Sequence, residues 1–192
     1  MPLLGKEVEE MSKKLLKLSM VLVVALLICY CLPKAEAAQS GSVAVKVTVT
    51  PSISVNIAET NLSFGSVAAG STSVSTGAVT VTNDGSGVNE TYSLSLGDPA
   101  GWTASQIAAG VETYILNAAF SSVASGISWD VTKHALSTTP VACIATKFNG
   151  DQTGVSVPYN GIRNLWFQFK APTATAVTTE QNIAVTITVQ AG

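Results

Sequence analysis

The sequence has few charged residues, and this scarcity excludes several classes of function. Only 11% of its 192 residues are Asp, Glu, Lys or Arg, whereas about 25% is usual for a soluble domain. The formal net charge is -2, so no basic surface for nucleic acid is expected. The solvent-facing surface must therefore consist mainly of Ser, Thr, Asn and Gln, around a core of the abundant Val, Ile and Leu.

Residues that catalyse reactions or bind metals are also scarce. The only histidine is His134, which we expect to be a solvated loop residue. No Gly-x-Ser-x-Gly motif is present, and one histidine with one cysteine beyond the leader cannot build a zinc site. Asp84 and Asp151 fit turn chemistry better than calcium binding, because neither loop has the EF-hand spacing.

Scattered carboxylates leave a glycosidase as the one enzyme class that the sequence does not exclude. Most of them stand beside turns, where aspartate is favoured for backbone reasons. They are Glu59, Asp84, Glu90, Asp98, Glu112, Asp130, Asp151 and Glu180. We therefore expect a protein that is not an enzyme, with no catalytic residues, no cofactor and no metal.

The first 37 residues have the features of a signal peptide. Lys13, Lys14 and Lys17 precede a largely apolar run from Leu18 to Leu32, and Ala35-Glu36-Ala37 offers small residues for cleavage before Ala38. The apolar run is shorter than the ~20 residues that cross a bilayer, so we expect no membrane span in the mature chain. The expected location is outside the cytoplasm: extracellular, at the cell surface or in the periplasm.

Cleavage at this site removes two of the three cysteines and leaves Cys143 alone. No disulfide can then form within the mature chain. Apolar neighbours surround Cys143 in the sequence and offer no base that would activate a thiol, so we expect a small core residue. A bridge between two chains remains an alternative.

Alternating apolar and small polar residues dominate residues 38–192, and this period of two predicts strands. Residues 38–51 predict an extended N-terminal strand, in which Ser42 to Val49 alternates most regularly, and Pro51 bends or ends it. Further strands are expected at residues 53–57, 62–67, 74–82 (with a bulge at Gly77), 90–96, 113–120, 127–129, 141–145, 163–170 and 182–190. No long segment beyond the leader has helical periodicity.

Many short strands separated by turn signals predict an all-β protein, either an antiparallel sandwich or a barrel. We favour a single immunoglobulin-like antiparallel β-sandwich over residues 38–192, because the chain shows no even series of equal hairpins. The Cys-Trp-Cys pattern of antibody domains is absent, so this prediction concerns the architecture only.

A short motif resembles a known family. Leu62-Ser-Phe-Gly-Ser-Val-Ala-Ala-Gly70, followed by Val79-Thr-Val-Thr-Asn-Asp-Gly85, is similar to the opening of immunoglobulin-like modules of the ASPM-SPD-2-Hydin and choice-of-anchor type. The resemblance implies a non-catalytic spacer or binding module. A larger secreted sandwich that shares only these opening strands is the alternative.

Two functions fit these features. The terminal segments 42–49 and 182–190 are β-prone and nearly free of charge, which predicts a secreted structural or cell-surface protein that assembles by adding strands between subunits. The alternative is an extracellular module for adhesion that binds glycans or a protein through Trp166 and Trp102. The expected partners are further copies of the chain, or a surface glycan or protein.

Overall fold

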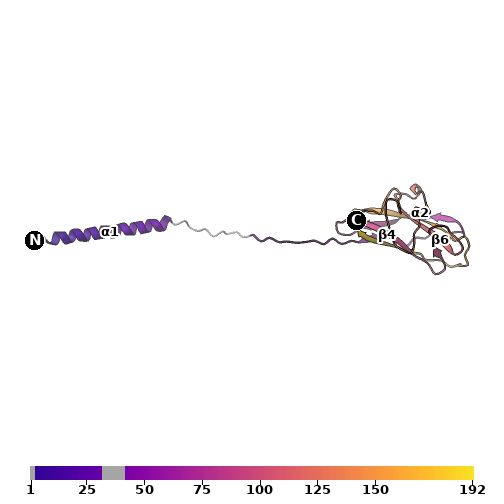
Figure 1. Cartoon of the computed structure of the whole chain (residues 1–192), viewed down its shortest axis with the longest axis horizontal. Coiled ribbons are helices and arrows are strands. Elements are labelled where there is room, and N and C mark those ends of the chain that lie inside the picture. The colour runs from indigo at the N-terminus through magenta and orange to yellow at the C-terminus, as the bar shows by residue number, and fades with distance from the viewer. Residues whose placement is uncertain (1–2, 32–41) are drawn as a thin grey trace. The chain divides into compact units, whose positions relative to one another are not determined.

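The computed structural model describes residues 3–31 and 42–192 and divides the chain into two units, Met1–Val47 and Thr48–Gly192. The first contains a single long helix, α1 (Leu3–Cys31) (Figure 1). Most of the predicted apolar run lies in this helix, whereas the predicted cleavage site at Ala35–Ala37 lies outside the described residues. Within the described ranges, no helix combines the length and the apolar character needed to cross a membrane.

The second unit is rich in strands that form two sheets. The larger sheet has the order β1 (Val55–Ile57), β3 (Val79–Asn83), β8 (Ile162–Lys170), β6 (Thr113–Phe120) and β5 (Thr103–Ala104), and β2 (Thr72–Val74) also pairs with β8. The smaller sheet has the order β7 (Val141–Ala142), β4 (Glu90–Gly97) and β9 (Ala184–Ala191). A 3-10 turn at Ala124–Gly126 and the four-residue helix α2 (Val131–His134) complete the unit.

Both sheets contribute to one hydrophobic core. Every second residue of β4 and β8 enters it, which is the arrangement that the alternating sequence predicts. Tyr92, Leu94 and Leu96 of β4 are at most 4% exposed. Leu165, Phe167 and Phe169 of β8 are at most 6% exposed. The predicted strands at 90–96, 113–120, 163–170 and 182–190 are confirmed, and their predicted and observed bounds differ by at most two residues.

Several predicted strands are wrong, and the backbone explains why. Residues 62–67 form no strand, because Gly65 has φ +62°, a left-handed conformation that breaks a ladder. The segment 74–82 is divided into β2 and β3, which pair with the same strand β8 on either side of an interruption that contains Gly77. Residues 127–129 form no strand, and the strand at 141–145 is only two residues long.

One strand pair departs from the predicted antiparallel pattern. β5 runs parallel to β6, with Thr103 opposite Thr113. The residues between the two strands return the chain to the end at which β5 begins, so β6 runs in the same direction as β5. All other pairs between the described strands are antiparallel.

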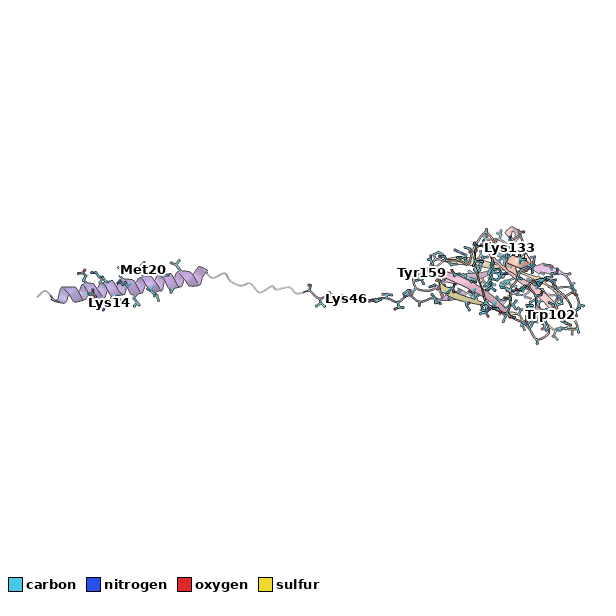
Figure 2. The ribbon with its side chains drawn as sticks, viewed as in Figure 1. Lys14, Met20, Lys46, Trp102, Lys133 and Tyr159 are labelled. Atoms are coloured by element: carbon cyan, nitrogen blue, oxygen red, sulfur yellow. The ribbon has the colours of Figure 1, made fainter. Side chains whose placement is uncertain are left out.

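Ser42–Val49, hereafter the N-terminal arm, is predicted to form a strand. None of its residues has strand structure or a backbone hydrogen bond among the residues that the structure describes. A strand exists only when a second strand supplies its hydrogen-bond partners. Figure 2 shows the side chain of Lys46 projecting from this extended segment. The arm therefore has the alternating sequence of a strand, but no described strand pairs with it.

Candidate functional site

Four valines of the N-terminal arm form an exposed aliphatic row. Val43, Val45, Val47 and Val49 are 88, 80, 77 and 82% exposed. They alternate with Ala44, Lys46 and Thr48, so in an extended chain they share one side. Burial of a valine stabilises a protein by about 1.5–3 kcal/mol.

Strand β9 is the second unusual feature, because it lies at an open edge. It pairs with β4 along its whole length, from Ala184 opposite Gly97 to Ala191 opposite Glu90, and with no other of the described strands. Its inward residues pack against the core but stay partly exposed; they are Val185, Ile187 and Val189. The residues opposite them on β4 are almost fully buried. The core is therefore less well covered along β9 than along β4.

The hydrogen bonds of β4 determine which groups of β9 are free. Glu90, Tyr92 and Leu96 donate their N–H groups to acceptors outside β9, at 2.9 Å in each case. In an antiparallel ladder, residues opposite such positions turn their own N–H and C=O groups away from the neighbouring strand. These opposite residues are Ala191, Val189 and Val185. They direct backbone donors and acceptors toward the open edge, near which β1 lies, although no described strand other than β4 pairs with β9.

The carboxylates highlighted by the sequence do not converge on one another. Most of them accept hydrogen bonds from backbone N–H groups and thereby fix loops. Glu59 accepts from Thr80 at 2.6 Å, and Asp98 accepts from Ala104 at 2.7 Å. Glu112, Asp130 and Asp151 accept from Ala176, Thr132 and Ser122. Hydrogen bonds from Thr175, Thr132 and Ser122, respectively, lower the pKa of these three carboxyls.

Glu90 differs from the other carboxylates because it is fully buried. Its Oε1 accepts from the backbone N–H of Ser54 at 2.7 Å, whereas Oε2 has no hydrogen-bond partner among the described residues. Within the same residues, no three His, Cys, Asp or Glu side chains are close enough to hold a metal ion. The main role of Glu90 visible in the structure is to hold the segment that follows the N-terminal arm.

His134 was expected to be a solvated loop residue, and this prediction is wrong. It lies in α2, is 2% exposed and packs edge-on against Trp129. Its Nδ1 accepts from the backbone N–H of Asp130 at 3.0 Å, so Nε2 carries the proton and donates to the carbonyl of Asn149. Burial lowers the pKa of this imidazole. Both ring nitrogens are engaged in structural hydrogen bonds.

Trp102 and Trp166 do not form a common binding surface. Trp102 stacks on Phe169, with ring centroids 5.9 Å apart, and its indole N–H donates to Thr175. Trp166 lies on the other face of β8 from Phe169, and its indole N–H donates to the carbonyl of Ser121 at 2.9 Å. Trp102 therefore closes one end of the core, while only Trp166 faces outward.

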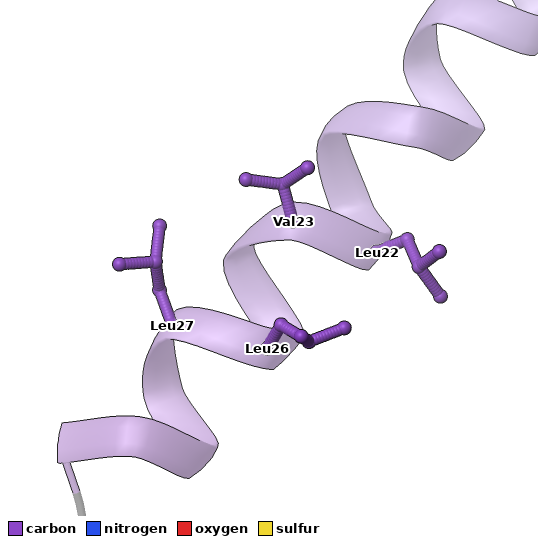
Figure 3. A pocket seen from close by; sticks show the side chains of 4 residues that line it. All are labelled: Leu22, Val23, Leu26 and Leu27. Carbon is purple, nitrogen blue, oxygen red and sulfur yellow. The ribbon is translucent and has the colours of Figure 1, made fainter.

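The hollows found on the described surface suggest no chemistry. One is bounded by Leu22, Val23, Leu26 and Leu27 of α1 alone, and Figure 3 shows these side chains projecting from a single helix. Another lies beside Asp98 and Leu136, where the Asp98 carboxylate already accepts from Ala104 and Tyr114. Neither hollow contains a nucleophile next to a base.

Cys143 is buried, as expected, and is 1% exposed. Burial raises the pKa of its thiol to about 12, so it is protonated at neutral pH and a poor nucleophile.

The comparisons with known proteins found no match among family models, curated proteins or solved structures. The resemblance of residues 62–85 to immunoglobulin-like modules therefore stays a prediction.

Proposed function

We propose that this chain is a secreted, non-catalytic structural protein that acts at the cell surface, in the periplasm or outside the cell, and that it assembles by adding strands between subunits. The N-terminal arm supports this proposal most strongly. It offers four exposed valines and a run of unpaired backbone groups. Strand addition satisfies both features at once, because backbone hydrogen bonds provide affinity and alternate side chains fill a groove.

The immunoglobulin-like sandwich forms part of the same proposal. Two sheets that contribute side chains to one core support a two-layer arrangement. A leader of the signal-peptide type, with three lysines before an apolar run, supports export. The test of export is mass spectrometry of the mature protein. An N-terminal residue at Ala38 supports cleavage, and a cytosolic product that retains residues 1–37 contradicts it.

Assembly is tested with the chain that begins at Ala38, by light scattering after size exclusion and by electron microscopy. We expect oligomers or filaments that grow with protein concentration. The double variant Val45→Asp/Val47→Asp should abolish them, because it places two charges in the apolar row. The matched control is Ala44→Asp/Thr48→Asp, which adds the same charge to the same segment on the opposite side and should leave assembly largely intact.

A wild-type protein that stays monomeric at high concentration and forms no filaments would contradict the proposal. Equal loss of assembly in both double variants would also contradict it, because the effect would then come from charge and not from the valine row. Circular dichroism of each variant checks that the strand content is unchanged.

A second candidate, an extracellular glycan- or partner-binding module, rests on Trp166, which stands on the outward face of β8. Its test is binding to a glycan array or to isolated surface fractions. Binding that is lost in Trp166→Ala supports this function, and absence of binding to any polysaccharide or surface fraction contradicts it.

A further inference from the structure

We infer that the acceptor for the N-terminal arm is the open edge of β9 in a second copy of the chain, and that the arm pairs there antiparallel to β9. This inference rests on the proposed strand addition and identifies its partner surface. Both elements have eight residues, Ser42–Val49 and Ala184–Ala191. Each has a single row of aliphatic side chains, and neither contains an acidic residue.

The free groups of the two elements complement each other. Val185, Val189 and Ala191 direct backbone N–H and C=O groups toward the open edge. The arm has no backbone hydrogen bond within the described residues, so it can supply the missing partners. The incompletely covered aliphatic row of β9 would then continue into the valine row of the arm.

The pattern of side chains restricts the register. In an antiparallel pair, residues directly opposite each other point to the same face. Alignment of Val43 with Val189 also aligns Val45 with Ile187 and Val47 with Val185, while Lys46 lies opposite Thr186 on the solvent face. A shift by one residue would turn the valines to the solvent and Lys46 toward the core. Registers that differ by one residue from this set are therefore disfavoured.

The segment after the arm opposes a tight turn that would lay the arm back along β1 of the same chain. The Ser52 carbonyl accepts from Ser86 at 2.8 Å, and the Ser54 carbonyl accepts from Asp84 at 3.2 Å, so these residues extend the ladder of β1 and β3. Only Thr50 and Pro51 would remain for a reversal. Two-residue hairpins require positive φ in at least one of these residues, typically Gly or Asn. Because Pro51 has a fixed negative φ, the positive φ would fall on the β-branched Thr50, for which it is strongly disfavoured.

Strand directions distinguish the possible partners. β1 starts at the end of the unit where β3 ends, because Val55 lies opposite Asn83, and β9 finishes at that same end, because Ala191 lies opposite Glu90. An arm that folds back on β9 of its own chain would run parallel to that strand. The same holds in a dimer in which two copies meet at this end and exchange arms. An arm that reaches β9 of a second copy from the opposite end, where β9 begins, runs antiparallel to it. Antiparallel pairs are slightly more stable, and this contact repeats from head to tail.

Disulfide trapping between two differently tagged proteins tests the acceptor and the direction. One protein carries Val43→Cys, and the other carries either Val189→Cys or Ile183→Cys. Antiparallel pairing brings the first pair to about 5.5 Å between Cα atoms, within the range for a disulfide. It leaves the second pair about 20 Å apart, six residues at about 3.3 Å each. We expect about tenfold more cross-linked heterodimer from Val43→Cys with Val189→Cys.

Each outcome is informative. A disulfide between Val43→Cys of one chain and Ile183→Cys of another would contradict the antiparallel direction. A disulfide within one chain that carries both substitutions would show that the arm pairs with β9 of its own chain and would contradict pairing with a second copy. Oligomers that form without any cross-link to β9 would overturn the acceptor but leave the proposed assembly intact. A protein that remains monomeric would instead overturn the proposed function itself. The chain that begins at Ala38 without these substitutions, in which the buried Cys143 is the only cysteine, gives the background.

Discussion

Two segments with nearly the same sequence pattern have opposite structures in this chain. Ser42–Val49 and Ala184–Ala191 both alternate aliphatic and small polar residues, yet only the second forms a strand. β9 pairs with all eight residues of β4, whereas the N-terminal arm pairs with none of the described residues. Alternation thus shows that a segment can join a sheet, but it does not show where the neighbouring strand comes from.

The largest expected effect comes from the strand that holds β9 in place. Leu94 of β4 is fully buried and lies opposite Ile187. Leu94→Ala should lower the free energy of unfolding by about 2–5 kcal/mol, because it removes buried methyl groups and leaves a cavity. The matched change Val45→Ala in the arm should alter it by less than about 0.5 kcal/mol in dilute, monomeric protein. Urea unfolding of both variants measures the difference.

Comparable losses in Leu94→Ala and Val45→Ala would show that the arm packs within its own subunit. The comparison between the two segments would then fail.

The next effect concerns the turn beside which the arm leaves the fold. Asn83 is fully buried, and its side chain donates to the carbonyls of Val88 and Val157 at 2.8 and 2.9 Å and accepts from Gly85 at 3.0 Å. Asn83→Ala should destabilise the protein by about 1–3 kcal/mol, because it leaves the N–H of the buried Gly85 without its acceptor and the carbonyl of Val88 without its side-chain donor. Thermal unfolding measures the loss. An unchanged melting temperature would contradict this role of Asn83.

A third change compares β9 and the arm directly. Ile187 is only partly buried, so Ile187→Ala should cost about 1–2 kcal/mol in dilute protein, roughly half of the usual loss for a fully buried position. Val47→Ala should again have almost no effect under these conditions. At concentrations where the protein assembles, both variants should weaken the oligomer. Sedimentation across a concentration series measures that weakening, and an effect of Ile187→Ala alone would argue against pairing of the two rows.

The smallest effect depends on pH and leaves the arm untouched. Burial lowers the pKa of His134, so the unfolded chain takes up a proton at higher pH than the native protein does. Stability is therefore unaffected well above the ordinary pKa of about 6.5. It should fall as the pH drops below this value, by at most about 1.4 kcal/mol per pH unit. Urea unfolding between pH 7.5 and 5 measures this slope.

His134→Gln should flatten the dependence on pH in that interval. An equal slope in wild type and variant would assign the effect to other groups. The carboxyls of Glu112, Asp130 and Asp151 have lowered pKa values, so their stabilising contribution is complete above the ordinary carboxyl pKa and is lost as the pH falls through the lowered pKa. This loss occurs at lower pH than the destabilisation by His134.

The sequence predicted the long paired strands well, since period-two alternation reports directly on half-buried strands. It was less informative where burial occurs without pairing. Leu62 and Phe64 are partly buried and pack against the core, yet Gly65 prevents a strand. The alternating residues there reported contact with the core and not a ladder. Local sequence could not distinguish these two outcomes.

The candidate site was predictable only in part. The charge-poor terminal segments were visible in the sequence, but which one would lack a partner depends on contacts between distant strands. The burial of His134 had no local signal either, because its partners at Asp130 and Asn149 are backbone groups. The separation of Trp102 and Trp166 had no local signal either: Trp102 stacks on Phe169 of β8, whereas Trp166 lies on the opposite face of that strand, and this arrangement follows from strand order.

The buried Cys143 has a practical consequence. Its thiol lies against Gly154, where an added Cβ would come within 2.7 Å of the sulfur, so a reagent molecule has no room to approach. Labelling by a maleimide or a similar probe should therefore proceed only when the strands around it open. The rate of labelling therefore reports the rate of that opening, and it can be measured at any protein concentration.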